Sequence, residues 1–147
     1  MEKRVVIREE DPQSVQALIA LDKHLAASGL SPIQRELIKI RASQINGCAF
    51  CISQHTRDAR KLGETEQRIY LLDAWRETDF YSGEERAILA LTEEVTHISK
   101  AGVTEETYRN VSALFGKKEV AALIMAIISI NAWNRIAIAT RMHPSLN

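Results

Sequence analysis

Apolar residues recur three and four positions apart along nearly the whole chain, and the strict alternation that is typical of β-strands is almost absent. Helical spacing of this kind places the apolar side chains on one face of each helix. A first helix is predicted between about residues 12 and 29, and a second between about 32 and 46. The second helix would bury a stripe formed by Ile33, Leu37, Ile40 and Ile45.

Capping residues mark where the predicted helices begin and end. Asp11 followed by Pro12 is a typical helix start, and Ser31 with Gln34 forms a capping box. Gly47 then stops the second helix. Similar signals predict five more helices, from about Cys48 to Leu62, Thr65 to Trp75, Ser82 to Gly102, Thr104 to Gly116 and Lys117 to Met142.

These elements predict a single all-α domain that spans residues 1–147, with about six to eight helices and short connections. Residues 1–10 would form an N-terminal arm that is extended from Val5 to Ile7. The last helix is apolar on all sides from Val120 to Ile128, a surface that a small monomer cannot easily bury. Part of this helix, with Trp133, is therefore expected at a subunit interface.

Composition and charge narrow the possible functions. The chain has 147 residues, 46% of them hydrophobic, and its 19 basic residues balance 19 acidic ones. This balance argues against nucleic acid or a membrane as the main partner. The longest apolar run, from Val120 to Ile128, is much shorter than the roughly 20 residues of a membrane span, and no secretory signal is visible. We therefore expect a cytoplasmic protein whose thiols are kept reduced.

The chain has two cysteines, Cys48 and Cys51, and His55 follows one helical turn later. At about 100° per residue these three side chains lie within an arc of ~60° on one helix face. Two thiols at this spacing can close a small disulfide, and histidine is suited to carry a proton near neutral pH. The backbone N–H groups at the start of the helix would stabilise Cys48 as a thiolate.

Glu36, in the preceding helix, is a further candidate for the same chemistry. If the helices on either side of Gly47 form a hairpin, the Glu36 carboxylate comes near the sulfurs. Burial there would raise the pKa of Glu36 and suit it to relay protons. The alternative is a solvated surface residue, because basic residues surround Glu36 in the sequence.

Two other interpretations of the cysteine pair stay open. Free cysteines are often buried, so the pair could belong to the core. A structural zinc site normally has four ligands, so Cys48, Cys51 and His55 would need His97, a glutamate or another chain. A reducing compartment favours a catalytic, redox-sensing or metal-binding pair over a structural disulfide. Since metal ligands are too few, we expect a redox-active dithiol with no metal and no other cofactor.

The spacing of Glu36, Cys48, Cys51 and His55, with the local sequence RASQINGCAFC that ends at Cys51, resembles the AhpD-like alkylhydroperoxidases. These belong to the carboxymuconolactone decarboxylase superfamily. The later runs EERAILALTE and INAWNR also look like that family, and the resemblance covers about residues 12 to 142.

The resemblance implies an all-helical homo-oligomer, trimeric or hexameric, that reduces organic hydroperoxides with its own thiols and without metal or flavin. Cys51 would be oxidised to sulfenic acid, and Cys48 would supply a proton and then form a disulfide with Cys51. Glu36 and His55 would relay protons. An external dithiol or thiol protein would reduce the disulfide. This assignment of Cys51 as the attacking thiol differs from the helix-dipole argument, which favours Cys48 as the more acidic thiol.

The chain departs from the family pattern at one position. Better-characterised members carry a histidine where this chain has Phe50, so we expect either weaker peroxidase activity or a relay that depends wholly on Glu36 and His55. The cysteine pair argues against lactone decarboxylation, because decarboxylase members usually lack it. Two alternatives remain: a protein disulfide reductase or redox adaptor for a partner peroxidase, and a non-catalytic oligomer with a redox-sensitive switch.

Overall fold

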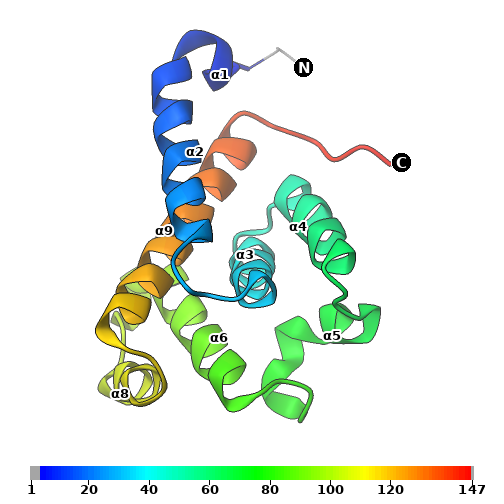
Figure 1. The fold of residues 1–147 in the computed structure, drawn as a ribbon. Helices are drawn as coiled ribbons and strands as arrows, with labels where there is room; N and C mark the ends of the chain where they lie inside the picture. The colour runs from blue at the N-terminus through cyan, green and yellow to red at the C-terminus, as the bar shows by residue number, and fades with distance from the viewer. Residues whose placement is uncertain (1–3, 147) are drawn as a thin grey trace.

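The computed structural model describes residues 4–146, and these residues form nine α-helices, one 3₁₀-helix and no β-strand (Figure 1). The predicted all-α fold is therefore confirmed. In chain order the elements are α1 (Ile7–Glu10), α2 (Pro12–Ala26), α3 (Pro32–Asn46), α4 (Ala49–Lys61), α5 (Glu66–Tyr70), the 3₁₀-helix η1 (Leu72–Glu77), α6 (Gly83–Thr96), α7 (Ile98–Ala101), α8 (Glu105–Leu114) and α9 (Lys117–Ala139).

The described residues contain ten helices, more than the six to eight expected, because two of the predicted helices are each divided and the expected arm contains the short helix α1. The helix expected to begin after Thr65 is split into α5 and η1, and Ala74 inside η1 has non-helical backbone angles. The helix expected to begin after Ser82 divides at His97 into α6 and α7. A break of one residue hardly disturbs the apolar spacing, so the spacing does not reveal it.

The N-terminal segment differs from the extended arm that the sequence suggested. Residues 1–3 lie outside the described residues, and Val5 and Val6 have no regular structure. Ile7 begins the single helical turn α1 instead of extending the chain. The side chain of Arg4 donates a hydrogen bond of 2.6 Å to the carbonyl of Ala139, which ties this segment to the end of α9.

The predicted caps are present where the helices begin. The Asp11 carboxylate accepts a hydrogen bond from the backbone N–H of Ser14 at the start of α2. Ser31 and Gln34 form the reciprocal capping box of α3, and Ser82 starts α6 in the same way. Each such cap satisfies N–H groups that the first helical turn leaves without partners. The caps are local in sequence, which is why they were predictable.

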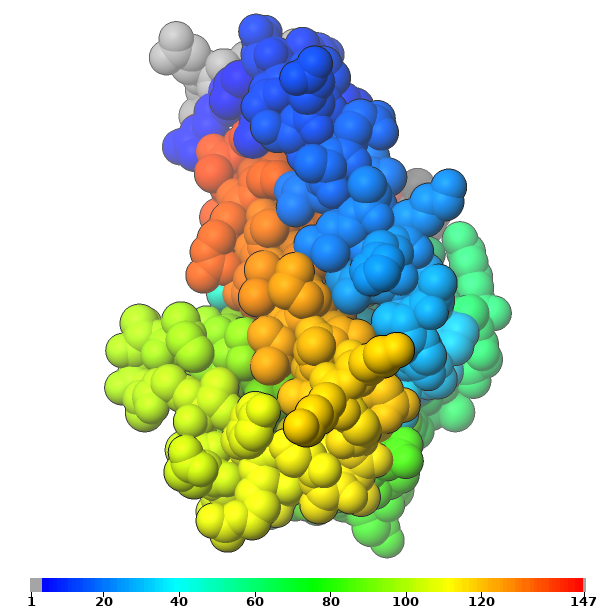
Figure 2. All heavy atoms as spheres, turned by 60° about the vertical axis from the view of Figure 1, so that its left-hand side comes forward, coloured from blue at the N-terminus to red at the C-terminus, as the bar shows by residue number. Residues whose placement is uncertain are grey.

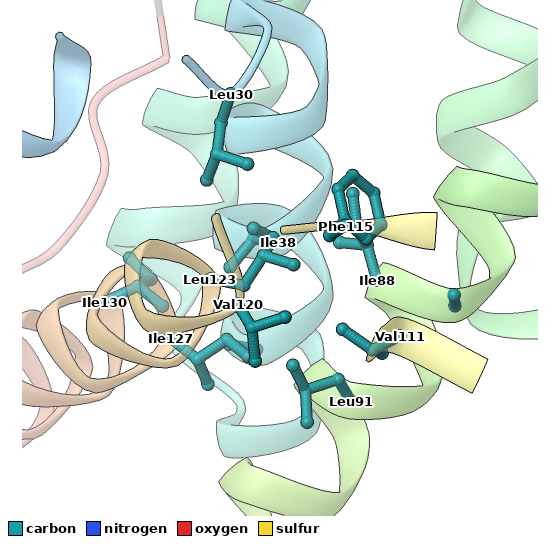
Figure 3. Close-up of a cluster of buried hydrophobic side chains, with 12 residues drawn as sticks. Leu30, Ile38, Ile88, Leu91, Val111, Phe115, Val120, Leu123, Ile127 and Ile130 are labelled. Atoms are coloured by element: carbon teal, nitrogen blue, oxygen red, sulfur yellow. The ribbon is translucent and has the colours of Figure 1, made fainter. Parts of the chain in front are cut away.

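Helix α3 is the centre of the molecule, and α4, α6 and α9 pack around it (Figure 1). One face of α3 joins α6, α8 and α9 in the larger apolar cluster, part of which Figure 3 shows. Another face joins α4, α5, η1 and α6 in a second cluster. Packing of α3 on two sides leaves its C-terminal end, and the turn that follows it, firmly positioned against α9.

Helix α9 packs against α2, α3, α6 and α8, and it also has an apolar outer face. Leu123, Ile127 and Ile130 face inward, whereas Met125 and Ile128 are among the exposed apolar residues. In Figure 2 this outer face is visible in gold and orange, below α2 and above α8. By length and composition alone α9 could also cross a membrane, although the apolar run identified from the sequence is shorter. In this fold it serves as a central packing helix.

Candidate dithiol site

A left-handed turn at Gly47 brings the cysteine pair to the start of α4. Gly47 has a φ of 69°, the backbone conformation that glycine adopts most readily, and it ends α3. The N–H of Cys48 then donates to the carbonyl of Ser43 at 3.0 Å. Cys48 is the N-cap of α4, and its sulfur accepts a hydrogen bond of 3.3 Å from the N–H of Cys51. The predicted placement of Cys48 at a helix start is therefore observed.

The sulfurs of Cys48 and Cys51 are joined as a disulfide, with the two Cα atoms 5.3 Å apart. Both side chains are almost fully buried, at 1% and 4% exposure. They pack with Ala137 of α9, and Phe50 lies partly buried beside them. The position that carries a histidine in better-characterised members thus provides an apolar wall here.

Glu36 of α3 meets His55 of α4, one helical turn after Cys51, and this contact links the two helices. The Nδ1 atom of His55 lies 2.9 Å from Oε2 of Glu36, and the ammonium of Lys39 lies 2.8 Å from Oε1. Glu36 is only 6% exposed. The alternative of a solvated Glu36 is therefore wrong. Basic residues surround Glu36 in the sequence, but in the fold its carboxylate is buried between α3 and α4.

The pKa of Glu36 lies below its ordinary value, which corrects the raised pKa expected from burial. Burial does push the pKa upward, but the hydrogen bond with His55 and the positive charge of Lys39 outweigh it. Glu36 is therefore ionised at neutral pH and accepts the proton of His55 Nδ1. This hydrogen bond fixes the tautomer of His55 and leaves Nε2 as the nitrogen that can exchange a proton with another group.

Asp58, one turn after His55 on α4, was not among the predicted site residues. Ligand-type atoms of Glu36, His55 and Asp58 lie within 4.8 Å of one another, a donor set that could in principle bind a metal ion. However, the Glu36 carboxylate already pairs with the Lys39 ammonium and His55. A bound cation would have to displace or face that ammonium, so the arrangement fits a proton-carrying pair better than a metal site.

A cavity of about 320 Å³ opens beside Cys51. Cys51 and His55 line it, whereas Cys48 and Glu36 are not among its lining residues. Helices α2, α3, α4 and α9 all contribute to the wall. The other lining residues are Arg8, Ile19, Asp22, Leu25, Arg35, Lys39, Phe50, Gln54, Ala126, Ile130, Trp133, Ala137 and Met142. The cavity therefore distinguishes the two cysteines, because Cys51 is one of its lining residues and Cys48 is not.

Buried amides hold the end of α3 against α9. Asn134 is fully buried and donates to the hydroxyl of Ser43 at 2.9 Å. Asn46 donates to the amide oxygens of both Asn131 and Asn134, each at 2.9 Å. These bonds position the turn that carries Cys48. The sequence analysis did not assign them a role; the available signal was a pair of asparagines inside the most apolar helix.

The four predicted site residues thus converge, and they do so within an all-helical domain that places a dithiol and a carboxylate–histidine pair beside a mostly apolar cavity. The model of the carboxymuconolactone decarboxylase family matches residues 12–94. The chain belongs to this family, as an AhpD-like member.

Three known proteins are similar to this chain in sequence or in fold. YdfG of Bacillus subtilis (strain 168), an uncharacterised protein, is 48% identical over 139 residues, which cover 95% of each chain. A crystal structure from Agrobacterium tumefaciens, ATU0492, is of a protein of unknown function regarded as a candidate AhpD antioxidant defence protein. It is 38% identical with a TM-score of 0.93, covering 99% of this chain and 100% of that one. The debrominase Bmp8 shares the fold, with a TM-score of 0.83 at 20% identity, covering 93% of this chain and 74% of that one.

Proposed function

We propose that the protein is a thiol-dependent alkylhydroperoxidase that reduces organic hydroperoxides with Cys48 and Cys51. The observation that carries the proposal is the placement of Cys51 and His55 on one cavity, with His55 hydrogen-bonded to ionised Glu36. The likeness to a candidate AhpD antioxidant defence protein supports the same activity class.

In the first step the reduced protein binds the hydroperoxide in the cavity, and His55 Nε2 takes the proton of the Cys51 thiol. The Cys51 thiolate attacks the terminal oxygen of the hydroperoxide, and the O–O bond breaks. The alkoxide leaves with the proton from His55, so one alcohol forms and Cys51 becomes a sulfenic acid. Glu36 stabilises the transient imidazolium through the hydrogen bond to Nδ1.

In the second step the Cys48 sulfur attacks the sulfur of Cys51. The S–S bond forms, the S–O bond breaks, and the hydroxyl leaves with the Cys48 proton as water. An external dithiol, free or carried by a protein, then attacks Cys51 and completes two exchanges. Both thiols are regenerated and the donor becomes a disulfide.

The positions of the two sulfurs reconcile the helix-dipole argument with these roles. Cys51 borders the cavity, so it is the sulfur that a substrate or a small thiol can reach. Cys48, at the N-cap, accepts the N–H of Cys51, which favours a negative charge on Cys48. A stabilised thiolate is a good leaving group when the disulfide is reduced. Acidity at Cys48 and attack by Cys51 are therefore compatible.

Peroxide consumption with dithiothreitol as the donor tests the proposal. We expect turnover by the wild type, and loss of turnover in Cys51→Ser and in Cys48→Ser. His55→Ala should lower the rate, while His24→Ala, which removes an exposed histidine on α2, should not. Equal slow consumption by the wild type and Cys51→Ser would refute the proposal. Reduction of protein disulfides without peroxide turnover would instead support a redox adaptor.

A further inference from the structure

The cavity beside Cys51 has an apolar side and a basic side. Helices α2 and α9 supply mainly apolar side chains, including Leu25, Ile130 and Ala137. Helix α3 supplies Arg35 and Lys39, which are four residues apart and therefore lie on the same helix face. Such a lining suits a ligand that is itself apolar at one end and negatively charged at the other.

The charged groups of the lining differ in whether they already have partners. Lys39 is paired with Glu36 at 2.8 Å. The Asp22 carboxylate accepts hydrogen bonds from the indole of Trp133, at 2.7 Å, and from the hydroxyl of Ser129, at 2.5 Å. Arg35 and Arg8 are different, because no carboxylate of the described residues forms an ion pair with either guanidinium. Of the two, Arg8 is exposed and Arg35 is half-buried.

Arg35 also carries a buried donor that no group of the described residues satisfies. Among the side chains that the structure describes, Nε of Arg35 is the one buried nitrogen or oxygen atom without a hydrogen-bond partner. Buried polar groups in native proteins are nearly always paired, and an unpaired group points to a water, an ion or a ligand that satisfies it. A guanidinium binds carboxylates through two parallel hydrogen bonds, and Arg35 is a lining residue of the cavity, where a carboxylate could meet it.

We propose that Arg35 binds the carboxylate of an amphipathic substrate, so that the hydroperoxides reduced at Cys51 are those of organic acids. This inference rests on the proposed peroxidase function and names its substrate class. The carboxylate lies on Arg35, the hydrocarbon part lies against α2 and α9, and the hydroperoxy group reaches Cys51. The planar guanidinium of Arg35 matches a carboxylate in geometry and in charge, which favours a carboxylate as the anionic group.

The size of the cavity is compatible with this ligand. A volume of about 320 Å³ is in the range of small-molecule sites. A second cavity of about 550 Å³ shares Arg8, Trp133 and Met142 with the first as lining residues. It adds Val5, Val6 and Ile136 to the apolar surface. A hydrocarbon chain too long for the first cavity therefore has an apolar continuation beside it.

Turnover of a matched pair of substrates tests the proposal. Linoleate hydroperoxide and its methyl ester have the same hydrocarbon and hydroperoxy groups, and they differ at the carboxyl group, which is charged in the acid and neutral in the ester. We expect the wild type to favour the acid by about tenfold in kcat/KM, as one charged hydrogen-bonded pair allows. Arg35→Gln should bring the acid-to-ester ratio close to one, and Arg35→Lys should leave an intermediate ratio. Arg109→Gln removes an exposed arginine on α8 and should leave the wild-type ratio.

Binding without chemistry separates this proposal from the peroxidase function. By calorimetry, decanoate should bind the wild type and Arg109→Gln, and bind about tenfold more weakly to Arg35→Gln. If decanoate binds in this way but no hydroperoxide is consumed, the peroxidase function fails and the acid site stands. The carboxylate site at Arg35 is overturned if the wild type turns over the acid and the ester equally. It is also overturned if Arg35→Gln keeps the acid preference or the affinity for decanoate. In each case the peroxidase function stands.

Discussion

His55 Nδ1 lies 2.9 Å from Oε2 of Glu36, and this one hydrogen bond joins α3 to α4 next to the cysteine pair. Glu36 is ionised because His55 and Lys39 outweigh the effect of burial on its pKa. The bond therefore holds His55 in one tautomer and one orientation. In the proposed mechanism, this positioned histidine is the group that carries the proton.

Glu36→Gln should slow the reaction without abolishing it. The amide keeps the size of the side chain but no longer stabilises an imidazolium on His55. A positioned proton-transfer group contributes about 10²–10⁴-fold. Because the variant keeps His55, we expect it to lose only part of this, a fall of about tenfold or more in kcat/KM for hydroperoxide. Steady-state kinetics with a dithiol donor measure it. Glu106→Gln, at an exposed position of α8, is the matched control. An unchanged rate in Glu36→Gln would remove Glu36 from the mechanism.

The same carboxylate makes stability depend on pH. The pKa of Glu36 is lower in the folded protein than in the unfolded chain, so the unfolded state binds more protons in acid. The contribution of Glu36 is therefore complete above its ordinary pKa of about 4.3 and is lost as the pH falls through the folded value. Urea unfolding should show that the wild-type advantage over Glu36→Gln shrinks below about pH 4.3. An advantage that grows in acid would contradict the lowered pKa.

Asn134→Ala should destabilise the protein although it removes few atoms. Asn134 is fully buried, and its loss leaves the amide of Asn46 and the hydroxyl of Ser43 with fewer partners. An unsatisfied buried group costs about 1–3 kcal/mol, so the urea midpoint should fall accordingly. Asn110→Ala, on the exposed side of α8, should change it little. Equal midpoints for the two variants would show that the amide network does not hold the cysteine turn.

Gly47→Ala should also cost stability, for a reason confined to the backbone. No atom lies within 4 Å of the position that a Cβ would take, so there is space for the methyl group. The φ of 69° is nevertheless unfavourable for any residue with a Cβ, by about 1–2 kcal/mol. Gly83→Ala, which has equal space at the start of α6 but no positive φ, should be neutral or slightly stabilising. Thermal or urea unfolding of the pair tests the comparison.

The outer face of α9 should hold subunits together. The homo-oligomer that the sequence suggested stays a prediction, and the exposed side chains of Met125, Ile128 and Ile138 support it. Ile128→Glu would place a charge in such an interface and should give a smaller species by light scattering. Ile98→Glu, on α7, is the control for an exposed isoleucine outside α9. A wild-type monomer at micromolar concentration would contradict the prediction.

The sequence predicted the elements whose signals are local. Caps such as Ser31 with Gln34 act within one helical turn, so the starts of the long helices were predictable. A helical hairpin about Gly47 was proposed to bring Glu36 near the cysteine sulfurs. The hairpin exists, and in it the Glu36 carboxylate meets His55, a contact that was not predicted. The direction of the Glu36 pKa was wrong, because it depends on which side chains reach the carboxylate in three dimensions.

Other parts of the site depend on contacts between distant segments, which spacing alone cannot reveal. Asn134 meets Ser43 across 91 positions, and Trp133 meets Asp22 across 111. The missing partner of Arg35 is likewise a property of the packed cavity, since in sequence Arg35 is one basic residue among several. The apolar pattern also predicted one continuous helix where the structure has two, because a break of a single residue, as at His97, hardly changes the spacing.

The central claim is that Cys51 is the sulfur that hydroperoxide oxidises and that Cys48 then bonds to it. Mass spectrometry after one equivalent of cumene hydroperoxide, in the presence of a sulfenic-acid trap, tests it most directly. The reduced Cys48→Ser variant should carry the trap on Cys51, Cys51→Ser should carry none, and the wild type should lose both thiols to an internal disulfide. Two results would contradict the claim. In the first, the trap labels Cys48 in Cys51→Ser but does not label Cys51 in Cys48→Ser. In the second, the wild type keeps both thiols.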